Sequence, residues 1–152
     1  DTPGFHVRRV VHTLRSAHYA TELQFVDMRV SDENILGEVN KGFAIANDRL
    51  TRQRIPYAAG CIGVAIKAQE MAVEYVPQRE TFGAPLSSRQ AIQWMLVDNE
   101  IDIKQSLWIT LEAAAKAERG ENFRKEAAMA KLVATEPTSS RKGISSWLAD
   151  LK

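Results

Sequence analysis

The stretch VPQRETFGAPLSSRQAIQW, residues 76–94, decides the fold because it separates two long segments of helical periodicity. Pro77 weakens the end of the first segment, and the Gly-Ala-Pro run at 83–85 breaks it. Ser87 and Gln90 have the spacing of a capping box, which predicts that the next helix begins at Ser87. Two long helices joined by so short a break are typical of an antiparallel bundle.

Helical periodicity extends on both sides of this break. It begins at Gly42, and Pro56 either starts a helix in its first turn or kinks one that continues. The second helix is predicted to continue to Gly120. A third helix is predicted from Asn122, a good N-cap, to Glu136.

The two ends of the chain have the character of strands. Residues 5–13 and 22–30 interleave apolar and polar side chains, with a slip at Phe25-Val26 that indicates a bulge or a change of exposed face. Residues 143–151 also alternate, and we expect this strand to pair with those at the other end. The predicted fold is α+β and mainly α: an antiparallel bundle of about three long helices with a small remnant antiparallel β-sheet.

Composition excludes several classes of partner. Twenty Lys and Arg against nineteen Asp and Glu leave a net charge of +1, which predicts neither nucleic acid nor an anionic membrane as partner. No run of about 18 apolar residues predicts a membrane span. Residues 1–4 are neither basic nor apolar, so we expect no signal peptide and a cytoplasmic, reducing location.

The cysteine and histidine residues do not predict a metal site or a catalytic site. Cys61, the lone cysteine, is expected to be a buried structural residue. His6, His12 and His18 are six residues apart, which spreads them over about 40 Å of extended strand and predicts no metal site.

Residues 76–94 also have the chemistry of a phosphate or nucleotide edge. Arg79 offers a planar fork for phosphate oxygens, and the Thr81 hydroxyl and the amides of a helix N-terminus also favour anions. The competing interpretation is a capped helix–turn–helix with a surface arginine.

Several motifs resemble those of acyl-CoA dehydrogenases, in that family's order. Arg-Glu-Thr-Phe-Gly at 79–83, followed by Gln90 seven residues after the glycine, resembles the helical-domain signature. Asp-Thr-Pro-Gly-Phe at 1–5 resembles a turn between two strands of the middle domain, and residues 25–43 resemble the passage into the helical domain. Ala-Ala-Met-Ala-Lys at 127–131 resembles the third helix of that domain.

The resemblance implies an FAD cofactor at a subunit interface. By match, Arg79 pairs with the FAD pyrophosphate held by a neighbouring subunit, with Thr81 and Phe82 alongside and Gln90 nearby. A homodimer or homotetramer is expected, which also suits long helices with two apolar faces.

The resemblance also implies an acyl-CoA thioester as substrate. Arg54 matches an arginine near the acyl-CoA site, and the neighbouring position, which supplies the catalytic glutamate in one subgroup of the family, is Gln53 here. A carboxamide cannot accept a proton from the substrate α-carbon, so no catalytic residue is predicted. The alternative function is a catalytically inert helical module for self-association.

The resemblance divides the chain into a middle β-domain remnant at 1–38, a C-terminal helical-bundle domain at 39–136, and a strand segment at 137–152 that belongs with the first part. Residues 141–150 resemble the strand that comes just before the Thr-Pro-Gly-Phe turn in the family. The expectation is therefore a rearranged fragment or a residue order assembled from separate pieces.

Overall fold

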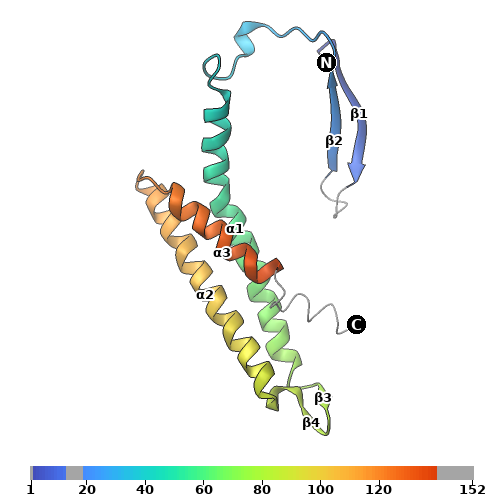
Figure 1. Ribbon diagram of the computed structural model, residues 1–152, viewed down its shortest axis with the longest axis vertical. Helices are drawn as coiled ribbons and strands as arrows, with labels where there is room; N and C mark the ends of the chain where they lie inside the picture. The colour runs from blue at the N-terminus through green and yellow to red at the C-terminus, as the bar shows by residue number, and fades with distance from the viewer. Residues whose placement is uncertain (1, 13–18, 140–152) are drawn as a thin grey trace. The chain divides into compact units, whose positions relative to one another are not determined.

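The computed structural model describes residues 2–12 and 19–139, and the chain divides into two compact units (Figure 1). One unit is Asp1–Ile45 and the other is Ala46–Lys152. The predicted fold class is confirmed, since three helices dominate and a small antiparallel sheet accompanies them. The strand expected at 143–151 lies outside the described residues. The domain assignments at 1–38, 39–136 and 137–152 stay predictions.

The first unit contains a two-stranded antiparallel sheet. It pairs β1 (Phe5–His12) with β2 (Tyr19–Phe25), and the register shifts between Val7 and Arg9. The prediction of a second strand at 22–30 was therefore wrong at both ends. The irregularity also lies in β1 rather than at Phe25-Val26.

Two residues with positive φ explain where the sheet ends. Asp27 has φ 47°, outside the extended region, so β2 cannot continue to residue 30. Gly4, at φ 88°, accepts a hydrogen bond from the Val26 amide at 2.9 Å. A Cβ at Gly4 would lie 2.3 Å from the Val26 carbonyl oxygen, so only glycine fits this close approach.

Every residue of β1 is exposed, although the rings of Phe5 and Phe25 meet across the sheet at 5.6 Å between centroids. Isolated two-stranded sheets are marginally stable in water. A short 3₁₀ turn, η1 (Asp32–Asn34), follows the sheet, and the Ser31 hydroxyl accepts the Glu33 amide there at 3.4 Å.

Three helices form the body of the second unit. They are α1 (Gly42–Tyr75), α2 (Gln90–Glu118) and α3 (Arg124–Ser139). Pro56 lies inside α1, so the helix continues through it rather than starting there. None of the described helices has the length and apolar character that a bilayer span needs.

The ends of the third helix test two predictions. Asn122 was predicted as the N-cap, but α3 begins at Arg124 and the Phe123 carbonyl accepts the Ala127 amide at 2.8 Å, so Phe123 is the N-cap. The Asn122 Oδ1 still accepts the Arg124 amide at 3.2 Å. The predicted end at Glu136 was wrong, since α3 runs to Ser139 and Pro137 does not stop it. Helix boundaries are the least certain part of a sequence-based prediction.

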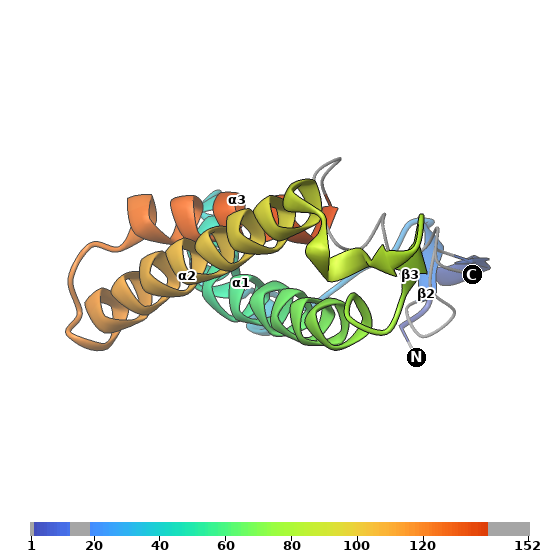
Figure 2. The ribbon, with the colours of Figure 1, turned by 90° about the horizontal axis from the view of Figure 1, so that it is seen from below.

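Contacts between the helices fix their antiparallel order (Figures 1 and 2). The Gln69 side-chain amide donates to the Leu96 carbonyl at 2.8 Å, joining the end of α1 to the start of α2. The Ser106 hydroxyl donates to the Val133 carbonyl at 3.2 Å, and Lys116 pairs with Glu126 at 2.6 Å, so α3 runs antiparallel to α2.

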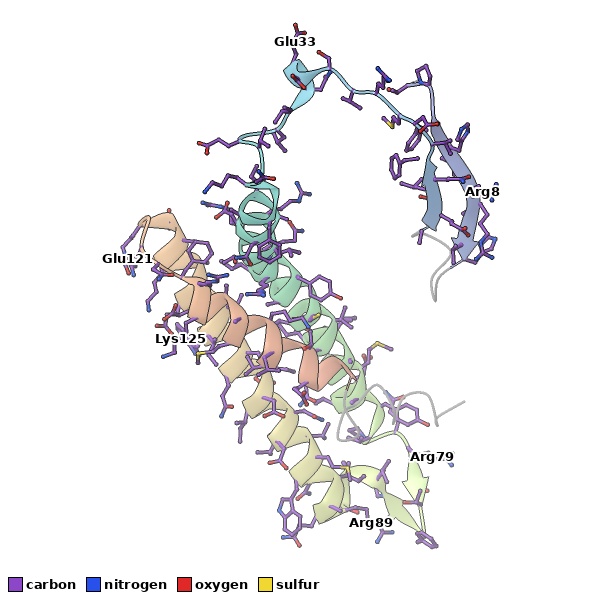
Figure 3. The ribbon with its side chains drawn as sticks, turned by 45° about the horizontal axis from the view of Figure 1, so that its top comes forward. Arg8, Glu33, Arg79, Arg89, Glu121 and Lys125 are labelled. Carbon is purple, nitrogen blue, oxygen red and sulfur yellow. The ribbon has the colours of Figure 1, made fainter. Side chains whose placement is uncertain are left out.

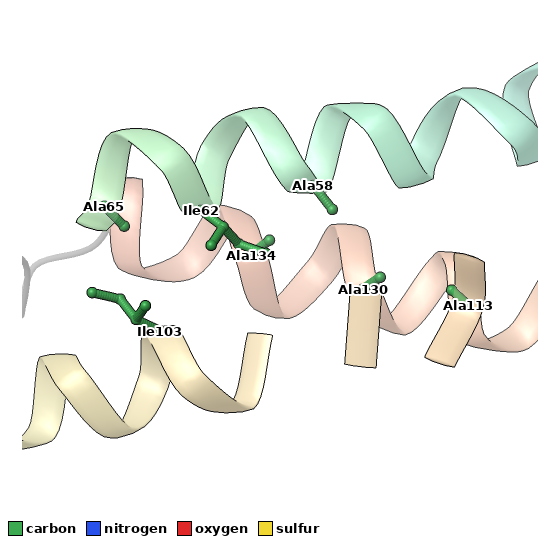
Figure 4. Packing of buried hydrophobic residues seen from close by; sticks show 7 residues of the cluster. All are labelled: Ala58, Ile62, Ala65, Ile103, Ala113, Ala130 and Ala134. Carbon is green, nitrogen blue, oxygen red and sulfur yellow. The ribbon is translucent and has the colours of Figure 1, made fainter. Parts of the chain in front are cut away.

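The core between the helices consists mainly of alanine (Figure 4). Its cluster draws on all three helices and comprises Ala58, Ile62, Ala65, Ile103, Ala113, Ala130 and Ala134. Small side chains let helix backbones approach closely. Cys61 was predicted to be buried but is half-buried, because it packs against the edge of this cluster rather than inside it.

Candidate functional site

The break between α1 and α2 folds as a miniature β-hairpin, defined here as Glu80–Pro85. Strand β3 (Glu80–Thr81) pairs antiparallel with β4 (Ala84–Pro85), leaving Phe82 and Gly83 as a two-residue loop. Their φ angles are 52° and 75°, the pattern of a type I′ turn, which matches the twist of paired strands. The tip of the hairpin is therefore a defined turn rather than a loose loop.

Two backbone hydrogen bonds close the base of the hairpin, and a third bond reaches its first strand from the residue before α2. The Leu86 amide donates to the Arg79 carbonyl at 2.6 Å, and the Ser87 amide donates to the Val76 carbonyl at 3.0 Å. The Arg89 Nη2 donates to the Thr81 carbonyl at 2.6 Å. Backbone bonds thus join the residues that flank the hairpin, and β3 is anchored to Arg89 just before α2.

The start of α2 differs from the capping box that the sequence predicted. A 3₁₀ turn, η2 (Leu86–Ser88), comes first, and α2 begins at Gln90 with Arg89 as its N-cap and no side-chain capping bond. The backbone of Ser87 is used instead, because its amide bonds to Val76 and its carbonyl accepts the Gln93 side chain at 2.9 Å. That part of the prediction was wrong.

The structure brings the four predicted cofactor residues together at one end of the helix pair, where Arg79 and Arg89 are labelled in Figure 3. Arg79 and Gln90 are exposed, and Thr81 is half-buried. Phe82 is 99% exposed. Among the described residues, the Arg79 guanidinium has no hydrogen-bond or ion-pair partner.

The two predicted substrate residues lie far from the hairpin. Gln53 is exposed and Arg54 is half-buried, and both are on α1. The 21 residues from Arg54 to Tyr75 span about 32 Å at 1.5 Å per helical residue. Within one copy of the chain, the predicted cofactor residues and the predicted substrate residues therefore lie at two separate locations.

A cation–π contact lies near the predicted substrate residues. The Arg52 guanidinium carbon is 5.9 Å from the centroid of the Phe123 ring. Arg52 also pairs with Asp48 at 3.0 Å, one turn earlier on α1. The contact with Phe123 places the Arg52 side chain beside the segment that precedes α3.

The charged groups with shifted pKa values cluster at the turn between α2 and α3. The hydrogen bond from Lys116 lowers the pKa of Glu126, whose side chain is 13% exposed, and the same bond raises the pKa of Lys116. The neighbouring Arg119–Glu121 pair raises the pKa of the arginine and lowers that of the carboxyl. This network joins two helices, and that role accounts for the shifts.

No group of three or more potential metal ligands occurs within 2–12 and 19–139. His6 and His12 are at opposite ends of β1, and His18 falls outside those ranges.

The hairpin offers a defined chemistry. An exposed guanidinium can bind phosphate oxygens through two parallel hydrogen bonds, and an exposed aromatic ring offers a flat apolar face. The start of α2 adds backbone amides and a partial positive charge. Together these groups suit a ligand that combines phosphate with a planar or ribose-bearing part.

Sequence analysis missed Arg89. Its guanidinium carbon lies 5.9 Å from the centroid of the Phe82 ring, in addition to its bond to the Thr81 carbonyl. Its position gave no signal, because Arg89 follows the expected helix start at Ser87 and arginine is an ordinary residue inside a helix.

Comparison with known proteins agrees with this geometry. The family described as "Acyl-CoA dehydrogenase, C-terminal domain" matches residues 40–139. The acryloyl-CoA reductase (NADH) of Anaerotignum propionicum is 39% identical over 136 residues, covering 89% of this chain and 34% of that protein. The short-chain specific acyl-CoA dehydrogenase of Megasphaera elsdenii is 39% identical over 140 residues, which cover 89% of this chain and 36% of that protein.

Solved structures give the same result. The butyryl-CoA dehydrogenase of Megasphaera elsdenii superimposes with a TM-score of 0.78 at 40% identity, covering 88% of this chain and 35% of that one. The acyl-CoA dehydrogenase of Geobacillus kaustophilus superimposes with a TM-score of 0.79 at 29% identity, covering 89% of this chain and 36% of that one. The chain thus spans about a third of the length of the relatives that it matches.

Proposed function

This chain belongs to the acyl-CoA dehydrogenase family, and from that premise we propose that it serves a flavoprotein that oxidises acyl-CoA thioesters between the α and β carbons. In this proposal the hairpin and the start of α2 form one wall for the nucleotide part of an FAD held by a second copy of the chain. Bound FAD would supply the acceptor for a hydride from the β carbon.

The residues at the hairpin fit such a cofactor. The Arg79 guanidinium is exposed and would bind pyrophosphate oxygens, and the Thr81 hydroxyl can donate a further hydrogen bond. Phe82 would cover an apolar face of the nucleotide, and Gln90 would donate or accept a hydrogen bond beside it. The single observation that carries the proposal is the ring of Phe82, which is 99% exposed on a turn with positive φ.

Phe82 is the most exposed of the large apolar side chains in the described part of the chain. A residue with a side chain at positive φ is uncommon, and such outliers persist where function requires them. A ligand contributed by a neighbouring subunit would cover the ring.

The residues proposed to bind the acyl-CoA substrate lie on α1. Arg54 would pair with an anionic group of the acyl-CoA, and Gln53 would hydrogen-bond beside it without removing a proton. The separation of about 32 Å along α1 supports an arrangement in which each copy gives its hairpin to one active site and its α1 residues to another. A homodimer or homotetramer follows from that arrangement.

Flavin content tests the proposal. The full chain, purified from a flavin-rich host or reconstituted with FAD, should show the visible absorbance of oxidised flavin and release FAD on denaturation. A colourless protein that does not bind added FAD in a dimer or tetramer would overturn it.

The second candidate function is an inert module for self-association. It is favoured by a stripe on α1 that repeats every seven residues and whose side chains are about half to two thirds exposed: Leu50, Tyr57, Val64 and Met71. A seven-residue apolar repeat is the pattern by which helices of separate chains pack together. An oligomer that binds neither FAD nor CoA would favour this function.

A further inference from the structure

The conformation of Phe82 needs something to hold it. Left-handed φ brings the Cβ of an L-residue too close to the backbone, and the first position of a type I′ turn favours asparagine or glycine over phenylalanine. The ring gains nothing from burial, because it is 99% exposed. Local contacts must therefore stabilise the turn.

Arg89 supplies two such contacts, and both reach the tip of the hairpin. Its Nη2 donates to the carbonyl of Thr81, the residue before Phe82, at 2.6 Å. Its guanidinium carbon lies 5.9 Å from the centroid of the Phe82 ring, within the range of a cation–π interaction. A hydrogen bond from a charged donor is about twice as strong as one between neutral groups.

Arg89 is itself fixed in place. It is half-buried and is the N-cap of α2, and its carbonyl accepts the amides of Ile92 and Gln93 at 3.0 and 3.1 Å. The tip of the hairpin is thus tied to the first turn of a 29-residue helix. Because the Arg89 backbone is held in this way, its side chain reaches the hairpin from a fixed point.

We propose that Arg89 is a positioning residue that holds the Phe82–Gly83 turn in its left-handed conformation and so presents the Phe82 ring to the nucleotide. The inference rests on the proposed function for the identity of that ligand. Arg89 acts through Phe82 and the Thr81 carbonyl, and Arg79 remains the group that binds phosphate.

The contact between Arg89 and Phe82 has a signature that does not depend on any ligand. Protons at the end of the Arg89 side chain lie near the face of an aromatic ring, so their NMR signals should be shifted upfield in the full chain. Replacement of Phe82 by leucine should return them to ordinary values. Unshifted signals in the parent protein would overturn the contact.

A second experiment compares the FAD affinity of the Arg89→Met variant, the Arg89→Lys variant and the parent protein. Arg89→Met keeps the aliphatic stem but removes both contacts, and we expect its FAD affinity to fall about tenfold because the competent turn becomes a minor conformer. Arg89→Lys retains a charged donor but not the planar stack, and should recover part of the loss. Helical circular dichroism of each variant checks that the bundle remains folded.

The possible results are distinguishable. Loss in Arg89→Met with partial recovery in Arg89→Lys supports the positioning role. Equal affinity for the parent and both Arg89 variants, while Arg79→Ala weakens binding, would overturn the role and leave the proposed function in place. A parent protein that binds no FAD would overturn the proposed function and, with it, the presentation of Phe82 to a nucleotide.

Discussion

Replacing Ile103 by alanine tests the packing that brings the three helices together. Ile103 is 4% exposed and lies on α2, near Ile62 and Ala65 of α1 and Ala134 of α3 (Figure 4). Removing three carbons from a buried site costs about 2.4 kcal/mol in transfer free energy, at about 0.8 kcal/mol per methylene. The cavity left behind adds to this, because the surrounding structure relaxes only partly to fill it.

Alanine is a better helix former than isoleucine, so the substitution also stabilises the helix by about 0.4 kcal/mol. We therefore expect Ile103→Ala to lower the free energy of unfolding by about 3 kcal/mol. The matched control is Ile101→Ala, two residues away on the same helix but 46% exposed, where the loss should stay below about 1 kcal/mol. Both substitutions delete the same atoms, so their difference isolates burial.

Urea unfolding followed by helical circular dichroism measures both variants. The midpoint should fall much further for Ile103→Ala than for Ile101→Ala, with the same dependence on urea concentration as in the parent. Equal losses in the two variants, or a loss below about 1 kcal/mol for Ile103→Ala, would refute the packing of Ile103 against α1 and α3.

Three further perturbations have defined outcomes. Gly83→Ala should destabilise the hairpin by about 1–2 kcal/mol through its φ of 75° alone, since no atom lies within 4 Å of the added Cβ; hydrogen exchange of the Leu86 amide would report it, and unchanged exchange would contradict it. Glu126→Gln should destabilise the protein at neutral pH. The lowered pKa of Glu126 means that this difference is complete above the unfolded-state value of about 4.3 and disappears as pH falls through the lower folded-state pKa. A difference that grows on acidification would be inconsistent with the Lys116 contact. Gly4→Ala should weaken the β1–β2 sheet, because its Cβ would lie 2.3 Å from a carbonyl oxygen, and NMR cross-strand contacts as strong as in the parent would count against this.

The helical part of the fold could be predicted from the sequence because periodicity over 16 to 34 residues is a strong signal. The start of α1 at Gly42 and its length past Pro56 illustrate this, since tertiary packing of a long apolar face outweighs the local effect of one proline. The family motif grouped Arg79, Thr81, Phe82 and Gln90, and these residues lie at one end of the helix pair. Their role in binding FAD stays a prediction.

Features that depend on one dihedral angle or one contact could not be predicted. The end of β2 follows from the left-handed φ of Asp27, which the apolar alternation through residue 30 does not indicate. Ser87 and Gln90 have capping-box spacing, but a 3₁₀ turn takes the place of the first helical turn. Arg89 contacts residues seven and eight positions away, a relationship that exists only once the hairpin has formed.

The FAD dissociation constant of the Arg79→Ala variant tests the central claim most directly. The control is Arg124→Ala, which removes another exposed arginine, on α3 and away from the hairpin. Loss of a charge-assisted phosphate contact should weaken FAD binding at least about tenfold in Arg79→Ala and leave Arg124→Ala equal to the parent. Identical FAD affinity in all three proteins would contradict the assignment of the hairpin as a wall of the nucleotide site.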